Sequence, residues 1–526
     1  MRKKLSFRLL PSEAADPAQV LRLVAASLGT LPAEISGYDI LKHSIDARGK
    51  QAWINLTVEA TIHEPWEPRP AGPFEFRDVR KSPRRVIIVG AGPAGLFAAL
   101  RLLVHGIKPI ILERGKDVRS RRRDLAQLNK EGEVNPESNY CFGEGGAGTY
   151  SDGKLYTRSS KRGDVGRILN LFVHFGAEEN IRYEAHPHIG TNKLPRIITA
   201  MREQIIASGG EVHFGCKLVD FQLTGNRITS LSTANGSTWQ AGDVILATGH
   251  SARDIFELLE AKKIRIENKP FALGVRAEHP QSIIDSAQYH CQVRDRWLPP
   301  AAYSLVEQVA EKGVFSFCMC PGGIIAPAAT SPGELVVNGW SPSKRNNPFA
   351  NSGIVVSVDE QDVAGIPELR RWRESPLLLM KFQQLVEQRA FSAGGGKLVA
   401  PAQRLGDFVA GKPSASLPGC SYLPGIRPVG LEDVLPSFIH TRLQAGFAGF
   451  GKKIRGYLTN EAVVVATESR TSSPVRIPRD PDSLRHPQIE NLYPCGEGAG
   501  YAGGIVSAAM DGERLADQIH AAGPGR

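Results

Sequence analysis

Two cysteines, Cys318 and Cys320, stand one residue apart in the stretch "VFSFCMCPGG". A thiolate can act as a nucleophile or exchange electrons with a redox group. On a strand, residues two apart share one face, where two buried cysteines also pack well as small apolar groups. The pair is therefore a candidate redox site, with a purely structural role as the alternative. The sequence has no Cys-x-x-Cys motif and no second pair of Cys or His at metal-site spacing, so we predict no metal site.

Three further residues have side chains suited to proton transfer or substrate binding. Glu468 and Arg470 lie in "ATESRTSSPVRIP", and His188 lies in "PHIGTNKL". An arginine suits a carboxylate or phosphate of a substrate, and an imidazole suits acid–base catalysis. A structural salt bridge between domains explains Glu468 and Arg470 equally well, and a lone histidine is more often a hydrogen-bonded core residue. Both alternatives stay open for these residues.

The elements that would position these side chains begin at a glycine-rich turn. In "RVIIVGAGPAGLFAALRLL" a buried strand runs into Gly90, Gly92 and Gly95, a helix follows, and the next strand ends at Glu113. This order is typical of a dinucleotide site. We expect Gly90 to make the tight turn, Gly92 to let a pyrophosphate approach the backbone, and Gly95 to allow close helix–strand packing. Glu113 would accept hydrogen bonds from a ribose, and the helix N-terminus would donate amides to phosphate.

Glycine clusters elsewhere favour FAD over NAD as the dinucleotide. A strand in "GDVILATGHSARD" precedes a second turn, and "NLYPCGEGAGYAGGIVSAAM" predicts a strand, a loop and a helix near the C-terminus. A flavin is long, so its ribitol and ring need a separate loop and helix N-terminus. We expect Glu497 to face the ribitol, and Gly503, Gly504 and Ile505 to approach the pyrimidine edge. The amides of that helix would favour negative charge on the reduced flavin.

A third cluster, "NYCFGEGGAGTYSDGKL", predicts a loop laid along the flavin, with a flexible surface loop as the alternative. The strand in "VHFGCKLVDFQL" is expected to offer backbone contacts to adenine. The predicted FAD contacts are Gly90, Gly92, Pro93, Ala94, Gly95, Glu113, Arg114, Gly145, Gly146, Gly148, Lys217, Leu218, Val219, Ala247, Thr248, Gly249, Gly496, Glu497, Gly503, Gly504 and Ile505.

The composition is that of an ordinary globular protein, with 41% hydrophobic and 22% charged residues in 526. A net charge of +10 is modest for this length, and attraction for a phosphate-bearing cofactor or an anionic metabolite explains it as well as nucleic acid does. The count of seven cysteines is odd and most of them are far apart, which does not suggest a disulfide framework. The N-terminus lacks an apolar core for secretion, and no apolar run is long enough to span a membrane. We expect a cytoplasmic protein.

The order of patterns predicts one domain split by another. We expect a small α+β domain of βαββ type at 1–65 and a linker at 66–84. The first part of an FAD-binding domain would span 85–255 and its last part 458–526, with a substrate domain inserted at 256–457. Alternating strands and helices in the split domain indicate a parallel α/β sheet.

The motifs together resemble a known family. "SIDARGK", "VGAGPAGLFAALRL", "NPESN", "FGEGGAGTYSDGKLYTR", "PHIGTNKL", "ATGHSARD", "FCMCPGG", "PAQRLGDF", "ESRTSSPVRI" and "GEGAGYAGGIVSAAMDG" are similar to bacterial FAD-dependent dehydrogenases, or NAD(P)/FAD-dependent oxidoreductases, of unassigned substrate. The resemblance covers nearly the whole chain. It implies an α/β fold with a glutathione-reductase-type, Rossmann-like FAD domain, an inserted α+β substrate domain and a small N-terminal domain.

The function predicted is hydride transfer between FAD and an unidentified small organic substrate. No second Gly-x-Gly-x-x-Gly follows a strand, so NADH or NADPH would bind transiently as a donor without a Rossmann domain of its own, or a redox partner protein would reduce the flavin. Two alternatives remain. One is a flavoprotein bound to RNA through its basic N-terminal domain, which deletion of residues 1–70 would test. The other is a flavin-binding protein without turnover.

Overall fold

A five-stranded parallel sheet organises the part of the chain that carries the glycine motifs. The computed structural model describes residues 1–157 and 163–523. The strands lie in the order β22-β10-β4-β5-β6, and every neighbouring pair is parallel. Their bounds are β4 Arg85–Val89, β5 Lys108–Leu112, β6 Glu211–His213, β10 Asp243–Leu246 and β22 Leu492–Pro494. Strands β4 and β5 are nearly continuous apolar runs because both faces of the sheet are covered.

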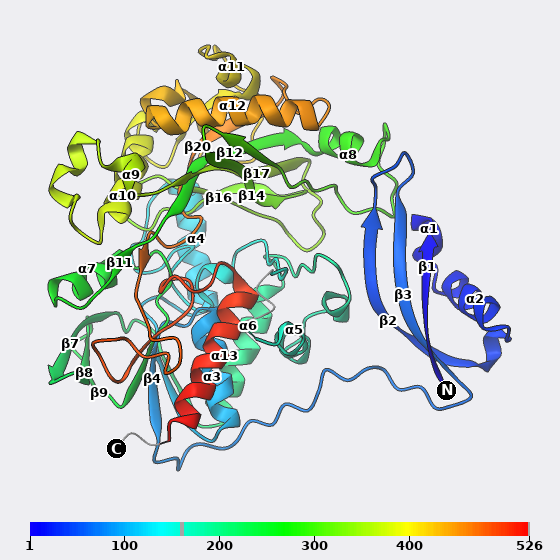
Figure 1. The fold of residues 1–526 in the computed structure, drawn as a ribbon, viewed down its shortest axis with the longest axis horizontal. Coiled ribbons are helices and arrows are strands. Elements are labelled where there is room, and N and C mark those ends of the chain that lie inside the picture. The colour runs from blue at the N-terminus through cyan, green and yellow to red at the C-terminus, as the bar shows by residue number, and fades with distance from the viewer. Residues whose placement is uncertain (158–162, 524–526) are drawn as a thin grey trace.

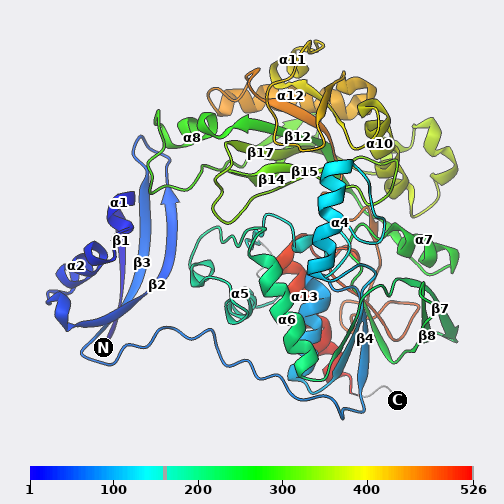
Figure 2. The ribbon, with the colours of Figure 1, turned by 180° about the vertical axis from the view of Figure 1, so that it is seen from behind.

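Helices cover one face of this sheet, and a small antiparallel sheet covers the other. Helices α3 (Pro93–Val104), α6 (Leu194–Ala207) and α13 (Ile505–Ala521) lie side by side, with α5 (Val165–His174) beside them (Figure 1, Figure 2). Strands β7 (Leu218–Thr224), β8 (Arg227–Thr233) and β9 (Thr238–Gln240) and helix α7 (Arg253–Ala261) pack on the opposite face. Helices α3 and α13 approach closely because Gly512 has no side chain; a Cβ there would meet the Ala94 carbonyl oxygen at 2.1 Å.

A seven-stranded mixed sheet forms the second layered unit, in the order β13-β14-β17-β12-β20-β18-β19. Its strands are β12 Phe271–Pro280, β13 Val306–Val309, β14 Lys312–Cys320, β17 Phe349–Val358, β18 Ala400–Arg404, β19 Ile426–Pro428 and β20 Val463–Glu468. Two short pairs, β15 (Ile324–Pro327) with β16 (Val337–Trp340) and β11 (Glu267–Asn268) with β21 (Val475–Arg476), lie outside it.

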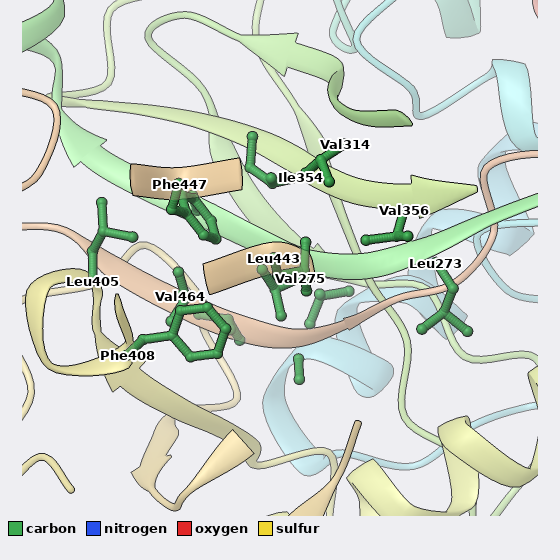
Figure 3. Packing of buried hydrophobic residues seen from close by; sticks show 14 of the residues in the cluster. Leu273, Val275, Val314, Ile354, Val356, Leu405, Phe408, Leu443, Phe447 and Val464 are labelled. Carbon is green, nitrogen blue, oxygen red and sulfur yellow. The ribbon is translucent and has the colours of Figure 1, made fainter. Parts of the chain in front are cut away.

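The core of this unit is a single apolar cluster. Side chains from β12, β14, β17 and β20 meet Leu443 and Phe447 of α12 (Ser437–Lys453) and Phe408 of α11 (Leu405–Ala410) (Figure 3). These side chains are almost fully buried, so their transfer from water stabilises the sheet as one body. The remaining helices of this unit are α8 Gln281–Tyr289, α9 Glu360–Val363 and α10 Leu378–Gly394.

The N-terminal segment forms a separate antiparallel sheet in the order β1-β3-β2. Its elements are β1 Arg2–Leu9, α1 Pro11–Ala14, α2 Pro17–Leu28, β2 Ile35–Asp46 and β3 Trp53–Ile62. It lies at one side of the molecule, and an extended stretch leads from it back to β4 (Figure 1). His43 Nδ1 lies 3.0 Å from Glu184 Oε2, and Ile54 joins the core of the seven-stranded sheet. These contacts fasten the N-terminal sheet to the rest of the chain.

The structure is thus a mixed α/β fold with a parallel sheet. Within residues 1–157 and 163–523, helices long and apolar enough to cross a membrane are absent. The same residues contain no group of three His, Cys, Asp or Glu side chains that could hold a metal ion.

Candidate functional site

A large cavity opens where the carboxyl ends of strands β4 and β10 face the seven-stranded sheet. Its volume is about 410 Å³, within the range of small-molecule sites. Ligands of open parallel sheets bind outside the carboxyl ends of the strands, which is where this cavity lies. Turns after β4, β10 and β22 line one side, and Cys318, Asn338 and Arg470 from the opposing unit line the other.

Two glycines of the first motif are required by packing. Gly90 has φ +107°, and a Cβ there would meet the Ala247 carbonyl oxygen at 2.4 Å. A Cβ on Gly95 would meet the Gly90 carbonyl oxygen at 2.0 Å. The tight turn and the close helix–strand approach predicted from the spacing are therefore both present.

Other glycines leave open space in front of their backbone. Gly503 and Gly504 would carry a Cβ with no atom within 4 Å, and the same holds for Gly249. Gly92 has only the Gly146 Cα nearby, at 3.9 Å. All four line the cavity, where α3 and α13 both begin. Backbone without side chains at two helix N-termini fits a long ligand. Its pyrophosphate would lie at the N-terminus of one helix and its electron-accepting ring at the N-terminus of the other.

Glu113 fastens the turns around the cavity. Its carboxylate accepts hydrogen bonds from the backbone N–H of Ala91 at 2.8 Å, Gly115 at 2.8 Å and Gly143 at 3.0 Å. Glu113 also lines the cavity, and a carboxylate has about four acceptor sites, so one remains for a ribose hydroxyl. The contact of Glu113 with a ribose stays a prediction, whereas the structure shows that its carboxylate binds the backbone of the turns.

The third glycine cluster is held by a residue that the sequence did not single out. The guanidinium of Arg121 is completely buried and donates to the carbonyl oxygens of Asn139, Tyr140, Glu144 and Gly146, each at 2.8 Å. Arg121 belongs to the basic run Arg119–Arg123, and it is the one arginine of the four in this run that is buried, so the run itself was only a weak signal. This loop is therefore built into the cavity wall, which argues against a flexible surface loop.

The cavity contains most of the predicted cofactor contacts. The residues that line it are Gly90, Gly92, Pro93, Ala94, Glu113, Arg114, Gly146, Gly148, Lys217, Leu218, Ala247, Thr248, Gly249, Glu497, Gly503, Gly504 and Ile505. Arg114 lines it with its charge already balanced, since it donates to Glu137 at 2.9 Å and to Asp254 at 3.0 Å.

Four predicted contacts do not line the cavity. Gly95 is one of them, because it serves the close helix–strand packing described above. Val219 does not line the cavity, and its side chain, 44% exposed, points to the face of β7 opposite Leu218; a contact between its backbone and adenine stays a prediction. Gly145 serves the loop itself, since a Cβ there would meet Thr149 Oγ1 at 2.0 Å. Gly496 donates its N–H to Asp511 Oδ2 at 2.8 Å and does not line the cavity.

The two faces of β7 lead to a first prediction. Val219→Lys is expected to change the affinity for the bound cofactor by less than about twofold, because exposed substitutions of this kind have small effects. Leu218→Ala, the adjacent change on the cavity side, is expected to weaken binding about tenfold, or about 1.4 kcal/mol. Titration of apoprotein, followed by flavin fluorescence, measures both. Equal losses of affinity in the two variants would show that Leu218 and Val219 do not differ in their distance from the cofactor.

Comparisons with known proteins agree with this geometry. The family described as "FAD-dependent protein, C-terminal domain-like" matches residues 270–471, "FAD binding domain" matches 84–126, and a domain of unknown function matches 1–61. An uncharacterized protein of Clostridium beijerinckii is 39% identical over 524 residues, with 96% of each chain covered. The chain belongs to this family of FAD-dependent proteins. It binds FAD, and the open glycines of the cavity fit that cofactor.

Three solved structures are more distant in sequence. 2,6-Dihydroxypyridine-3-hydroxylase from Arthrobacter nicotinovorans is 10% identical, with 83% of this chain and 84% of that chain covered and a TM-score of 0.37. Glycine oxidase from Bacillus cereus is 13% identical, with 84% and 95% covered and a TM-score of 0.31. CtdE in complex with FAD is 10% identical, with 84% and 85% covered and a TM-score of 0.32.

In the FAD-dependent protein, Glu468 forms a buried ion pair and does not line the cavity. Arg276 Nε lies 2.8 Å from Glu468 Oε2, and both side chains are completely buried. Burial raises the pKa of Glu468 to about 7, although Arg276 opposes this shift. Of the two alternatives for Glu468, the geometry favours the structural one.

Arg470 lines the cavity and also takes part in a buried charge network. Its Nε and Nη2 donate to the two oxygens of Glu387 at 2.7 and 2.9 Å, and Arg253 donates to the same carboxylate at 2.8 Å. Burial would raise the pKa of Glu387, but the two arginines lower it below its usual range. Arg470 Nη1 has no hydrogen-bond partner in the part of the chain that the structure describes. Both predicted roles, the salt bridge and a contact to a ligand, are compatible with this arrangement.

His188 lies behind the cavity wall, which corrects its placement as a substrate-facing acid or base. Its Nε2 lies 3.6 Å from Asp152 Oδ1, and the side chain is only 8% exposed. Burial lowers its pKa, while Asp152 opposes that shift. The cavity contact in this region is Lys154, whose Nζ lies 3.2 Å from Asp152 Oδ2.

Two titratable residues at the cofactor side of the cavity have strongly shifted pKa values. Burial lowers the pKa of His250 to about 3 and raises the pKa of Glu497 to about 7. His250 Nδ1 lies 3.6 Å from Glu497 Oε1, so the neutral ring and the carboxyl share one wall. Shifts of this kind often mark functional sites.

Proposed function

We propose that this FAD-dependent protein is an oxidoreductase that transfers a hydride between the flavin and a small organic substrate. Bound FAD supplies the chemistry, because its ring accepts or donates a hydride. The observation that carries the proposal is that one cavity has the cofactor turns on one side and polar side chains of the opposing unit on the other. A substrate entering between them would lie against the cofactor.

The proposed architecture is a glutathione-reductase-type FAD domain built from 85–255 and 458–526, with a substrate domain at 256–457 inserted before its last strand. The pairing of β22 with β10 supports this division, because the C-terminal strand returns to the sheet that begins at β4. The seven-stranded sheet takes β12, β13, β14, β17, β18 and β19 from the insertion. It also includes β20, so this sheet extends past residue 457.

The proposed substrate is an anion or another molecule rich in hydrogen-bond acceptors. Lys154 and Arg470 line the cavity, and Arg470 Nη1 and His250 Nε2 have no partner among the described residues. A buried N–H without an acceptor costs free energy, which a ligand oxygen would recover. Because His250 is neutral, its free nitrogen can donate or accept a proton at the substrate.

The proposed electron source is NADH or NADPH as a transient donor, or a redox partner protein. An anaerobic screen of FAD-loaded protein against NADH, NADPH and fractionated metabolites tests the function, with the flavin absorbance as the measurement. We expect at least one small molecule to bleach the oxidised flavin within seconds to minutes. Dithionite bleaches any accessible flavin and serves as the control. A flavin reduced by dithionite alone would favour the non-catalytic alternative.

We also propose a cytoplasmic location for the protein. The seven cysteines, all within the described residues, are free thiols, which suits a reducing cytoplasm. In the hairpin of the N-terminal domain, Arg48 pairs with Asp46 at 2.8 Å while its side chain is 92% exposed. RNA binding through this domain stays the alternative that deletion of residues 1–70 tests.

A further inference from the structure

The Cys318–Cys320 pair differs from two cysteines that fill space in a core. Cys320 is fully buried, whereas Cys318 is partly exposed and lines the cavity. The pairing of β14 with β17 shifts register between Phe317 and Cys320, and Cys318 has φ +47°. This left-handed conformation is unfavourable for a residue with a Cβ, and such strain gathers at functional sites. The irregularity breaks the alternation of the strand and brings Cys318 to the cavity.

A single ammonium group contacts both sulfur atoms. Lys154 Nζ lies 3.8 Å from Cys318 Sγ and 3.7 Å from Cys320 Sγ, and it donates to the Met319 carbonyl oxygen between them. Asp152 fixes this lysine from behind, at 3.2 Å, and is itself fixed by Ser341. Lys154 comes from the glycine-rich loop of the cofactor side, so the two layered units meet at these thiols.

The charges around the pair favour a thiolate at one sulfur and a thiol at the other. A hydrogen bond from Cys320 and the cations Lys154 and Arg276 lower the pKa of Cys318, against burial and the charge of Asp152. Burial raises the pKa of Cys320 well above the usual value. An accessible thiolate beside a buried thiol is the arrangement of an attacking and a resolving cysteine.

We propose that Cys318 and Cys320 form a redox-active dithiol that exchanges two electrons with the bound flavin. The inference rests on the proposed oxidoreductase function and adds a second redox centre to it. Formation of the Sγ–Sγ bond releases two electrons and the proton of Cys320, and oxidised FAD takes up both electrons and that proton. Lys154 acts as a positioning residue, since it holds the thiolate without reacting.

The same pair would also react with an external disulfide. The Cys318 thiolate attacks one sulfur of the probe, forms a mixed disulfide and releases the first thiolate. Cys320 then loses its proton, attacks Cys318 and releases the second thiolate, which leaves the Cys318–Cys320 disulfide. Two thiolates are therefore released for each probe molecule that reacts.

The test uses full-length, FAD-loaded protein and peptide mass spectrometry. We expect the peptide with both cysteines to be two mass units lighter after dithiothreitol-reduced protein is kept anaerobically with excess oxidised FAD. Cys320→Ser should trap a stable mixed disulfide with 5,5′-dithiobis(2-nitrobenzoate) at Cys318, and Cys318→Ser should react at this peptide at least about tenfold more slowly. Cys420→Ser removes a cysteine outside the cavity and should behave like the wild type.

A pH profile separates the positioning role of Lys154 from a structural one. In wild-type protein the alkylation rate of Cys318 should stay level down to a pH well below the ordinary thiol pKa of about 8.5. Lys154→Met should raise the pH at which the alkylation rate of Cys318 is half its maximum, because the cation Lys154 is lost while Arg276, Asp152 and Cys320 still face the sulfur. An unchanged midpoint would overturn the assignment of Lys154.

Two results would overturn the dithiol itself. One is a wild-type peptide that keeps both free thiols in the presence of oxidised FAD. The other is a Cys320→Ser protein that forms no mixed disulfide at Cys318. If small molecules still reduced the flavin of these proteins at the wild-type rate, the proposed oxidoreductase function would stand and only the dithiol would fall. If the disulfide formed but no small molecule reduced the flavin, the dithiol would stand and the proposed transfer of a hydride from a small substrate would fall.

Discussion

Replacing Gly92 with valine is expected to give a folded but colourless protein, with an affinity for FAD at least about 100-fold lower, or about 2.7 kcal/mol. Gly92 lies in the turn before α3, has an ordinary negative φ of −74°, and a Cβ there would meet only the Gly146 Cα, at 3.9 Å. The protein alone therefore tolerates a larger side chain. Valine would instead fill the space that the pyrophosphate needs beside the helix N-terminus.

Two matched variants give this experiment its controls. Gly365→Val changes an exposed glycine with no atom within 4 Å of a Cβ, and it should leave flavin content unchanged. Gly95→Val should instead unfold the domain, because its Cβ would meet the Gly90 carbonyl oxygen at 2.0 Å. Flavin absorbance per protein and thermal unfolding of the apoprotein measure the two effects separately. A yellow Gly92→Val protein would show that the pyrophosphate lies elsewhere.

The glycine turns on the cofactor side of the cavity could be predicted from the sequence, because the spacing of glycines depends on local backbone geometry. Gly90 and Gly95 have the packing roles that their positions indicated, and Gly503 and Gly504 leave the open space expected of them. Such patterns concern residues a few positions apart along the chain. The return of the C-terminal segment to the split domain was inferred from the same kind of pattern, whereas its pairing with β10 is seen only in the structure.

The side of the cavity opposite the cofactor was harder to predict because its contacts are distant in sequence. The partner of Glu468 is Arg276, 192 residues away, and no local pattern connects them. The register shift in β14 that turns Cys318 toward the cavity depends on its neighbour β17. Leu218 and Val219 were predicted together, and only Leu218 lines the cavity, because neighbouring residues of a strand point to opposite faces.

Breaking the Arg276–Glu468 pair is expected to cause a large loss of stability. Arg276→Met should lower the free energy of unfolding by about 3–5 kcal/mol, because it leaves a buried carboxylate without its cation. Arg276 also donates to Asn351 Oδ1 at 3.0 Å and to the Cys318 carbonyl oxygen at 3.1 Å, and both acceptors would lose that donor. Chemical denaturation of the apoprotein at pH 8 measures the change.

The double variant Arg276→Met, Glu468→Met decides between a structural and a catalytic Glu468. Replacing a whole buried ion pair by apolar side chains is often close to neutral, so the double variant should recover most of the stability lost by Arg276→Met. The single variant should also be less destabilised at pH 5 than at pH 8. The pKa of Glu468, already about 7, would rise further without Arg276, so protonation at low pH would remove the uncompensated charge. If Glu468→Met alone were as stable as the wild type but lost flavin reduction by small molecules, Glu468 would act in catalysis.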